Sequence, residues 1–151
     1  DNVYNYPLTP FVATFVGENN PFYGKVVSVE NGKVKVESSG NTFVATPGKI
    51  DENKSHSFAN GDEVILFIRP ESIFVKNENN SFENTFSATI NTMEFEGNLK
   101  NIYLKLSSDI NVRFSVPNAV DTSELVSGKN VDLTFSTQKA VVLPKGVLAV
   151  D

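Results

Sequence analysis

Residues 22–37, FYGKVVSVENGKVKVE, decide the fold class of this chain. Two valine-rich stretches flank Asn31-Gly32, and the second alternates polar and apolar side chains from Lys33 to Glu37. An Asn-Gly pair between two such stretches is a strong hairpin signal, because both central residues of the favoured turn need a positive φ angle. This stretch therefore predicts an antiparallel β-hairpin.

The chain beyond this hairpin repeats the same pattern. Short runs dominated by Val, Ile, Phe and Thr alternate with clusters of Gly, Asn, Pro and Ser, which is typical of a β-barrel or sandwich. We therefore predict an all-β fold. The further runs predicted as strands are Thr42–Thr46, Glu63–Arg69, Ser72–Lys76, Phe86–Phe95, Asn101–Leu106, Asn111–Val116, Asn130–Ser136 and Ala140–Leu143.

The two halves of the chain resemble each other. The run 61–67, followed by 72–75, has a counterpart in the second half of the chain in 128–135, followed by 139–143. We predict a duplicated five-strand unit, with a first β segment at about 22–83 and a second at about 84–151, each supplying part of a shared core. Chance similarity between two amphipathic strands is the alternative.

The stretch 1–17 differs from the rest. Thr9-Pro10 pairs a hydroxyl N-cap with a proline at the first helical position, and Gly17 suits a C-cap, so a short helix is predicted between them. Phe11 and Phe15 would give this helix an apolar surface that needs a cover. We expect the cover to be either the rest of the chain or a domain that precedes it.

Composition excludes several kinds of site. The 151 residues include no cysteine and one histidine, so a thiolate metal site, a Cys nucleophile and a His-pair metal site are excluded. The net charge of −5 disfavours nucleic acid and anionic membrane surfaces as partners. His56 lies in a polar stretch and is predicted to be a solvated loop residue. We predict no catalytic residue, no cofactor site and no metal site.

Arg69-Pro70-Glu71 interrupts two apolar runs. Proline cannot donate a hydrogen bond to a sheet, so it should end the first of the two strands. The flanking charges would then form an exposed ion pair worth about 0–1 kcal/mol, or contact a neighbouring chain. From the residues alone, a strand-ending turn is favoured.

Several short motifs, in order along nearly the whole chain, resemble the C-terminal region of ABC-importer ATPases. The opening stretch 3–20 resembles the end of the ATP-binding domain, and Ile68-Arg69-Pro70-Glu71 resembles the signature of the appended β domain, called TOBE. The remaining motifs are Phe95-Glu96-Gly97, Tyr103-Leu104-Lys105-Leu106, Val116-Pro117-Asn118 and Ala140–Leu143, together with Gly17-Glu18 and Asn20. The last three are similar to polyamine (spermidine/putrescine)-type members.

This resemblance implies an OB-like β-barrel built from two similar segments. It assigns 1–17 to the tail of an ATP-binding cassette domain and 18–151 to the TOBE regulatory region. The expected role is regulation and dimerisation, with ATP and Mg bound by the missing domain and no ATPase activity in this part. The implied interaction residues are Arg69, Pro70, Glu71, Phe95, Gly97, Pro117 and Asn118, with Phe11 and Phe15 docking the N-terminus.

The same resemblance implies a place and partners. The chain would lie on the cytoplasmic side of the inner (plasma) membrane, as a peripheral part of a transporter. Its partners would be its own ATPase domain, the second ATPase subunit of a homodimer and the transmembrane permease. Two alternatives stay open: a β module that senses a small solute or oxyanion, and a nucleic-acid-binding OB domain in which the Phe and Tyr side chains stack on bases.

Overall fold

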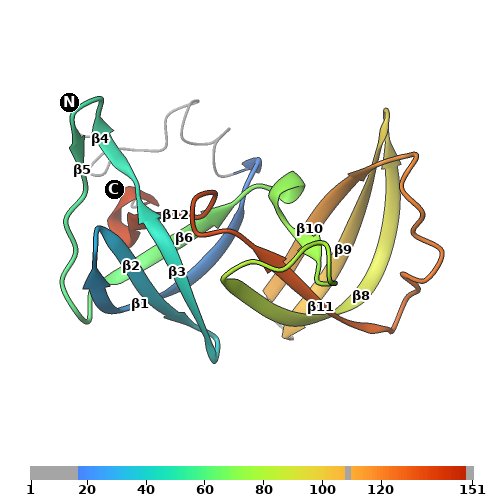
Figure 1. The fold of residues 1–151 in the computed structure, drawn as a ribbon, viewed down its shortest axis with the longest axis horizontal. Helices are drawn as coiled ribbons and strands as arrows, with labels where there is room; N and C mark the ends of the chain where they lie inside the picture. Colours follow the sequence, from blue (N-terminus) through green and yellow to red (C-terminus); the bar gives the residue numbers. More distant parts are fainter. Residues whose placement is uncertain (1–16, 108–109, 149–151) are drawn as a thin grey trace. The chain divides into compact units, whose positions relative to one another are not determined.

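The computed structural model describes residues 17–107 and 110–148 and confirms the all-β prediction (Figure 1). The predicted N-terminal helix, with Phe11 and Phe15, lies outside the described residues. The strands are β1 Asn20–Glu30, β2 Lys33–Ser38, β3 Asn41–Pro47, β4 Lys49–Asp51, β5 Lys54–Ser55, β6 Glu63–Ile68, β7 Phe74–Val75, β8 Asn84–Glu96, β9 Leu99–Ser107, β10 Ile110–Pro117, β11 Asn130–Phe135 and β12 Val141–Pro144. Two 3-10 turns, η2 Pro70–Ser72 and η3 Lys145–Leu148, complete the described elements.

The described strands form two compact units, unit 1 (1–68 and 136–151) and unit 2 (69–135). Unit 1 contains a closed barrel in the order β1-β2-β3-β12-β6. Its first hairpin turns at Asn31 and Gly32, with φ angles of 53° and 74°, as the sequence predicts. The barrel is tight between β1 and β2, where a Cβ on Gly24 would lie 2.1 Å from the carbonyl oxygen of Glu37.

Alternating apolar side chains fill the interior of the unit 1 barrel. Phe22 and Phe43 meet edge to face at 5.2 Å between ring centroids, an arrangement that aromatic pairs prefer. These two rings are almost fully buried, as are the side chains around them. The other buried apolar residues on the strands of this unit are Val26, Val34, Val36, Ala45, Val64, Ile65, Leu66, Phe67, Ile68 and Val142.

Unit 2 contains a five-stranded sheet in the order β10-β9-β8-β11-β7. Its long β8–β9 hairpin carries β10 on one side, and β11 with the short β7 on the other. Phe86 and Phe135 pack edge to face, at 6.1 Å between ring centroids, in the core of this unit. The remaining buried apolar strand residues of unit 2 are Ala88, Ile90, Ile102, Leu104, Val112, Phe114, Val131 and Leu133.

The two similar segments exchange their last strands. β12 follows β11 in the chain but pairs with β6 in unit 1, whereas β7 follows β6 and pairs with β11 in unit 2. The registers of the two pairs correspond under the sequence repeat, because Val142 lies opposite Leu66 and Val75 lies opposite Leu133. In Figure 1 the red C-terminal part of the chain accordingly returns to the blue and green strands of unit 1.

Because of this exchange, the predicted segments 22–83 and 84–151 do not coincide with the two units. The segments 22–83 and 84–151 were expected to share one core, whereas the described strands form two compact units, each completed by a strand from the other segment. The spacing of the runs does not show the exchange, because an apolar strand suits either unit equally well.

Shortening the side chain of Val142 on β12 should weaken unit 1 and leave unit 2 intact. Val142 is fully buried, so Val142→Ala should lower the free energy of unfolding by about 2 kcal/mol. Urea unfolding measures the loss, and amide hydrogen exchange locates it on β6. Val27→Ala is the control, because Val27 is 46% exposed and should change stability by about 0.5 kcal/mol or less. Faster amide hydrogen exchange on β8–β10 instead would contradict the pairing of β12 with unit 1.

Candidate functional site

The predicted turn at Arg69-Pro70-Glu71 is present, and it begins unit 2. β6 ends at Ile68, and Pro70 occupies the first position of η2, where its missing N–H costs nothing. The N–H of Ser72 donates to the carbonyl oxygen of Arg69 at 2.9 Å. Pro70 is buried, whereas Arg69 and Glu71 are exposed. η2 packs against β10, so the turn holds two side chains at the surface of unit 2 on a fixed backbone.

The other described interaction candidates meet at the end of the β8–β9 hairpin. Gly97 turns this hairpin with a φ of 59°, a conformation that glycine adopts at little cost. Asn118 holds the turn from the end of β10, since its Nδ2 donates to the carbonyl oxygen of Gly97 at 3.2 Å and its N–H donates to that of Asn98 at 2.9 Å. Pro117 lies opposite Leu99 in the β9–β10 register.

Phe95 stands out at this hairpin end because it is 71% exposed. Leu99 beside the same turn is also exposed. An exposed Phe on a well-fixed strand is suited to contact another molecule, because little conformational entropy is lost when it is covered. The arrangement suits binding, and it holds no nucleophile with an adjacent base.

A buried polar network fixes this hairpin, and the sequence analysis missed it. Asn101 on β9 is 4% exposed, and its Nδ2 donates to Glu96 Oε1 at 2.8 Å. Ser115 on β10 donates from Oγ to Asn101 Oδ1 at 2.5 Å. The network ties three strands together near the turn. The predicted strand began at Asn101, whereas β9 begins at Leu99 and places this asparagine inside the strand, where the residue type is depleted.

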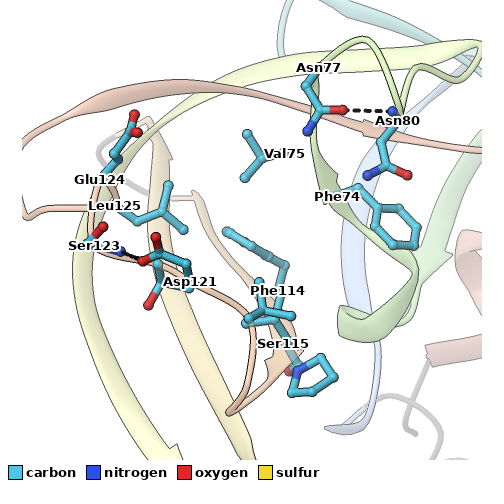
Figure 2. A pocket seen from close by; sticks show the side chains of 14 residues that line it. Phe74, Val75, Asn77, Asn80, Phe114, Ser115, Asp121, Ser123, Glu124 and Leu125 are labelled. Atoms are coloured by element: carbon cyan, nitrogen blue, oxygen red, sulfur yellow. Dashed lines mark hydrogen bonds between the residues drawn. The ribbon is translucent and has the colours of Figure 1, made fainter.

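Unit 2 also contains a pocket of about 470 Å³. It lies among β7 with the residues after it, the end of β10, and the loop 120–125. Figure 2 shows Asn77 and Phe74 on one side, Asp121 and Leu125 on the other, and Val75 and Phe114 between them. The lining residues are Phe74, Val75, Asn77, Asn80, Phe114, Ser115, Val116, Pro117, Val120, Asp121, Thr122, Ser123, Glu124 and Leu125.

Hydrogen bonds fix the loop 120–125 at the rim of the pocket. Lys100 donates from Nζ to the carbonyl oxygen of Val120 at 2.6 Å and to Thr122 Oγ1 at 3.1 Å. The N–H of Ser123 donates to Asp121 Oδ1 at 2.9 Å. Hydrogen bonds from the backbone and hydroxyl of Ser123, with a smaller contribution from the charge of Lys100, lower the pKa of Asp121. Asp121 is therefore ionised at neutral pH.

The charge of the lining restricts what the pocket can hold. Asp121 and Glu124 are acidic, and no lining residue is basic. Oxyanion sites use Arg, Lys or clustered N–H donors, so this lining does not suit an oxyanion. In the described part of the chain, no group of three or more His, Cys, Asp or Glu side chains is placed to hold a metal ion. The same residues include no helix with the length and apolar character needed to cross a bilayer.

His56 differs from its predicted state. It follows β5, and its residue is 9% exposed rather than solvated. Its N–H donates to the carbonyl oxygen of Gly48 at 2.9 Å, and its ring lies 6.2 Å from that of Phe58. Burial lowers the pKa of His56. The short β4–β5 ribbon, itself part of unit 1, places His56 beside Gly48 and Phe58. The runs of the sequence did not predict this ribbon.

The chain is similar to a known domain family and to parts of longer curated proteins. The family described as the TOBE domain matches residues 66–143. The spermidine/putrescine import ATP-binding protein PotA of Fusobacterium nucleatum is 29% identical over 121 residues, which cover 76% of this chain and 30% of that protein. The PotA of Thermotoga maritima is 33% identical over 56% of this chain and 22% of that protein.

The chain is also similar to one further curated import protein and to a solved structure. The sulfate/thiosulfate import ATP-binding protein CysA of Ralstonia nicotianae is 34% identical over 48% of this chain and 18% of that protein. The solved structure of the cytoplasmic molybdate-binding protein ModG superposes with a TM-score of 0.68 at 19% identity, covering 82% of this chain and 94% of that one. That identity is low, so the superposition shows a shared fold. The chain spans at most about a third of the length of each of these curated import proteins.

Removing the exposed ring of Phe95 should leave the fold intact. Phe95→Ser should change the free energy of unfolding by about 0.5 kcal/mol or less, because most of its surface already faces water. Phe114→Ala is the comparison, and it should cost about 3–5 kcal/mol because Phe114 is 1% exposed. Urea unfolding measures both. A loss at Phe95 as large as that at Phe114 would show that Phe95 is a structural residue.

The buried His56 should make unfolding depend on pH. Its pKa is lower in the folded state than its ordinary value of 6.5, so below pH 6.5 the unfolded chain binds more protons and stability falls as the pH drops. His56→Gln removes this contribution. The stability advantage of the natural chain over the variant should therefore shrink between about pH 7.5 and about pH 5. Urea unfolding at each pH checks this, and an advantage that stays constant would contradict it.

Proposed function

Because the chain belongs to the TOBE domain family, we propose that it is the C-terminal accessory region of the ATP-binding subunit of an ABC importer. The observation that carries this proposal is the similarity, over 121 residues, to a spermidine/putrescine import ATP-binding protein. The TOBE match and the described all-β units support an accessory role for this part, rather than a role as the nucleotide-hydrolysing domain.

In this role the chain regulates the transport cycle and helps two ATPase subunits to dimerise. Its partners are its own ATP-binding domain, the second ATPase subunit and the transmembrane permease. The subunit is peripheral, on the cytoplasmic side of the inner membrane. ATP and Mg bind to the preceding domain, and this part takes up no cofactor. Phe11 and Phe15 are proposed to pack the stretch 1–17 against either that domain or the β region of this chain.

The geometry of unit 2 supports contact with a partner. Phe95 is exposed on a hairpin that Asn101 and Asn118 hold in place. Arg69 and Glu71 are exposed on the backbone that Pro70 fixes. A surface that is ordered before it meets its partner loses little entropy on association, which suits an interface that persists through repeated cycles.

The similarity to the PotA proteins supports a polyamine-type importer. The sulfate/thiosulfate relative matches a smaller share of the chain, and the molybdate-binding structure is similar in fold. The pocket of unit 2 has an acidic rim, which also counts against an oxyanion ligand. Transport of labelled spermidine by the reconstituted importer, with sulfate as the comparison, tests this assignment.

The coding sequence immediately upstream gives the first test of the proposed function. A reading frame that continues into an ATP-binding cassette supports it. If the frame opens at an initiation codon immediately before Asp1, with no cassette encoded, the proposal fails.

The parent subunit gives a second test, in proteoliposomes with its permease. Phe95→Ser should change the ATPase rate by about fivefold or more, the lower end of ordinary coupling between sites. Tyr23→Ser is the matched control, since Tyr23 is an exposed aromatic residue on β1 of unit 1. Equal rates for the natural subunit and both variants would remove Phe95 from the regulatory surface.

A further inference from the structure

The two units differ at the position where the barrel of unit 1 closes. In unit 1 the last pair is parallel, with Val141 of β12 opposite Thr46 of β3 and Val142 opposite Pro47. The sequence repeat makes β7 the counterpart of β12, and the strand order makes β10 the counterpart of β3. β7 and β10 are the two edges of the described sheet in unit 2 and do not pair there. We call the space between these two strands the seam.

Local chemistry agrees with this difference. In unit 1, Gly48 follows Pro47, and its N–H donates to the carbonyl oxygen of Val142 at 2.8 Å. A Cβ on Gly48 would lie 2.3 Å from Leu143 Cδ2, so a larger residue here would require the Leu143 side chain to shift. In unit 2, Asn118 follows Pro117 and donates its N–H to Asn98, away from the seam. Unit 1 therefore has a closed joint, whereas in unit 2 β7 and β10 do not pair and η2 packs against β10.

The pocket of about 470 Å³ occupies the seam. Its lining includes both residues of β7 and four consecutive residues of β10, Phe114–Pro117. Phe74 is 37% exposed, so part of this apolar wall faces water. The carboxylates of Asp121 and Glu124 stand at the opposite rim, as Figure 2 shows. Two strand edges, apolar walls and an acidic rim thus meet in one place.

We propose that the seam receives an extended segment of a partner protein, with an apolar centre and a Lys or Arg beside it. An unpaired strand edge offers a row of N–H and C=O groups, and extended peptides bind to such edges by adding a strand. The apolar walls accept alternate side chains of the segment. Its basic residue pairs with the carboxylates of Asp121 and Glu124, of which Glu124 Oε1 already lies 4.0 Å from Lys129 Nζ. This proposal concerns a second interaction surface, and it does not depend on the transport role.

In unit 1, β12 fills the position that corresponds to the seam, and its sequence shows which side chains suit that position. β12 and its flanks read Lys139-Ala-Val-Val-Leu-Pro-Lys145, with an apolar centre between two lysines. Ala140 and Val142 are fully buried, and Lys145 lies 3.1 Å from Glu63 Oε1 at the barrel surface. The occupant of the seam should share this pattern. A synthetic peptide with the sequence of residues 139–145 is therefore a suitable probe.

The experiment measures binding of this labelled peptide to the full chain by fluorescence anisotropy at low salt. We expect saturable binding, with amide chemical-shift changes on Phe74, Val75 and Val116. Shifts confined to β3 and β6 would show that the peptide displaces β12, and would overturn the proposal. The double variant Asp121→Asn with Glu124→Gln should weaken binding by about tenfold, as expected for the loss of about 1.4 kcal/mol of charge interaction.

The control variant is Glu30→Gln with Glu52→Gln, which removes two exposed carboxylates of unit 1 and should leave binding unchanged. Equal weakening by both double variants would show non-specific charge attraction and overturn the proposal. Circular dichroism and urea unfolding establish that both variants are folded before binding is compared.

Two further probes identify the class of occupant. A peptide with alternate backbone amides N-methylated keeps its side chains but cannot donate along the strand edge, so it should bind at least about tenfold more weakly. Unchanged binding of this peptide would overturn strand addition. If 1,5-diaminopentane displaces the peptide at equal concentration, the pocket is a small-cation site. If sedimentation shows that the peptide dissociates a dimer of the chain, the occupant is a second copy. Either result would overturn the proposal.

Discussion

The reciprocal pairing of β12 with β6, and of β7 with β11, is the constraint on which the described structure depends. Each unit is a sheet of strands adjacent in the sequence, plus one strand that arrives from the other segment. Without β12 the unit 1 barrel would expose the edges of β3 and β6 and the buried residues between them. Because parallel pairing needs a long connection, the chain closes this barrel only after it has passed through unit 2.

This constraint also explains where the interaction residues lie. The chain enters unit 2 at Arg69, directly after β6, and Pro70 sets the direction in which β7 departs. At the far end of β10, Asn118 bonds back to the β8–β9 turn instead of continuing along the sheet. Both places are junctions where strand pairing stops, and the side chains of Arg69 and Glu71 are exposed there. In the interior of a paired strand, the backbone groups are taken up by the sheet.

The sequence was informative where a local rule applied. Asn31-Gly32 predicted the first hairpin because its turn requires positive φ angles, and Pro70 predicted the end of β6 because proline cannot donate to a sheet. The repeat was visible because matching strands keep the same spacing in both segments. The candidate residues Phe95, Gly97 and Asn118 came from family resemblance, and their common position at one hairpin end emerged only from the register.

Features that depend on non-local pairing were not predictable in this way. The exchange of β7 and β12 leaves the apolar pattern of each strand unchanged. His56 looked solvated because its neighbours are polar, whereas the β4–β5 ribbon carries it against unit 1. The network of Asn101, Glu96 and Ser115 joins residues from three strands, so no spacing along the chain marks it. The pocket lies at the seam between β7 and β10. That seam is recognisable only by comparison with the paired strands β12 and β3 of unit 1.

The two similar segments form units of different kinds, a closed barrel and an open sheet. The described interaction candidates fall within 69–135, the span of unit 2. Unit 1 has the closed barrel, while unit 2 keeps two unpaired strand edges in its described sheet and two acidic residues in the pocket lining. A closed barrel has no edge for another strand, whereas unit 2 keeps two strand edges in its described sheet and a partly exposed Phe74 beside the pocket. Closing one copy therefore pairs every strand edge of its barrel, and the proposed strand addition uses the two edges that the other copy leaves unpaired.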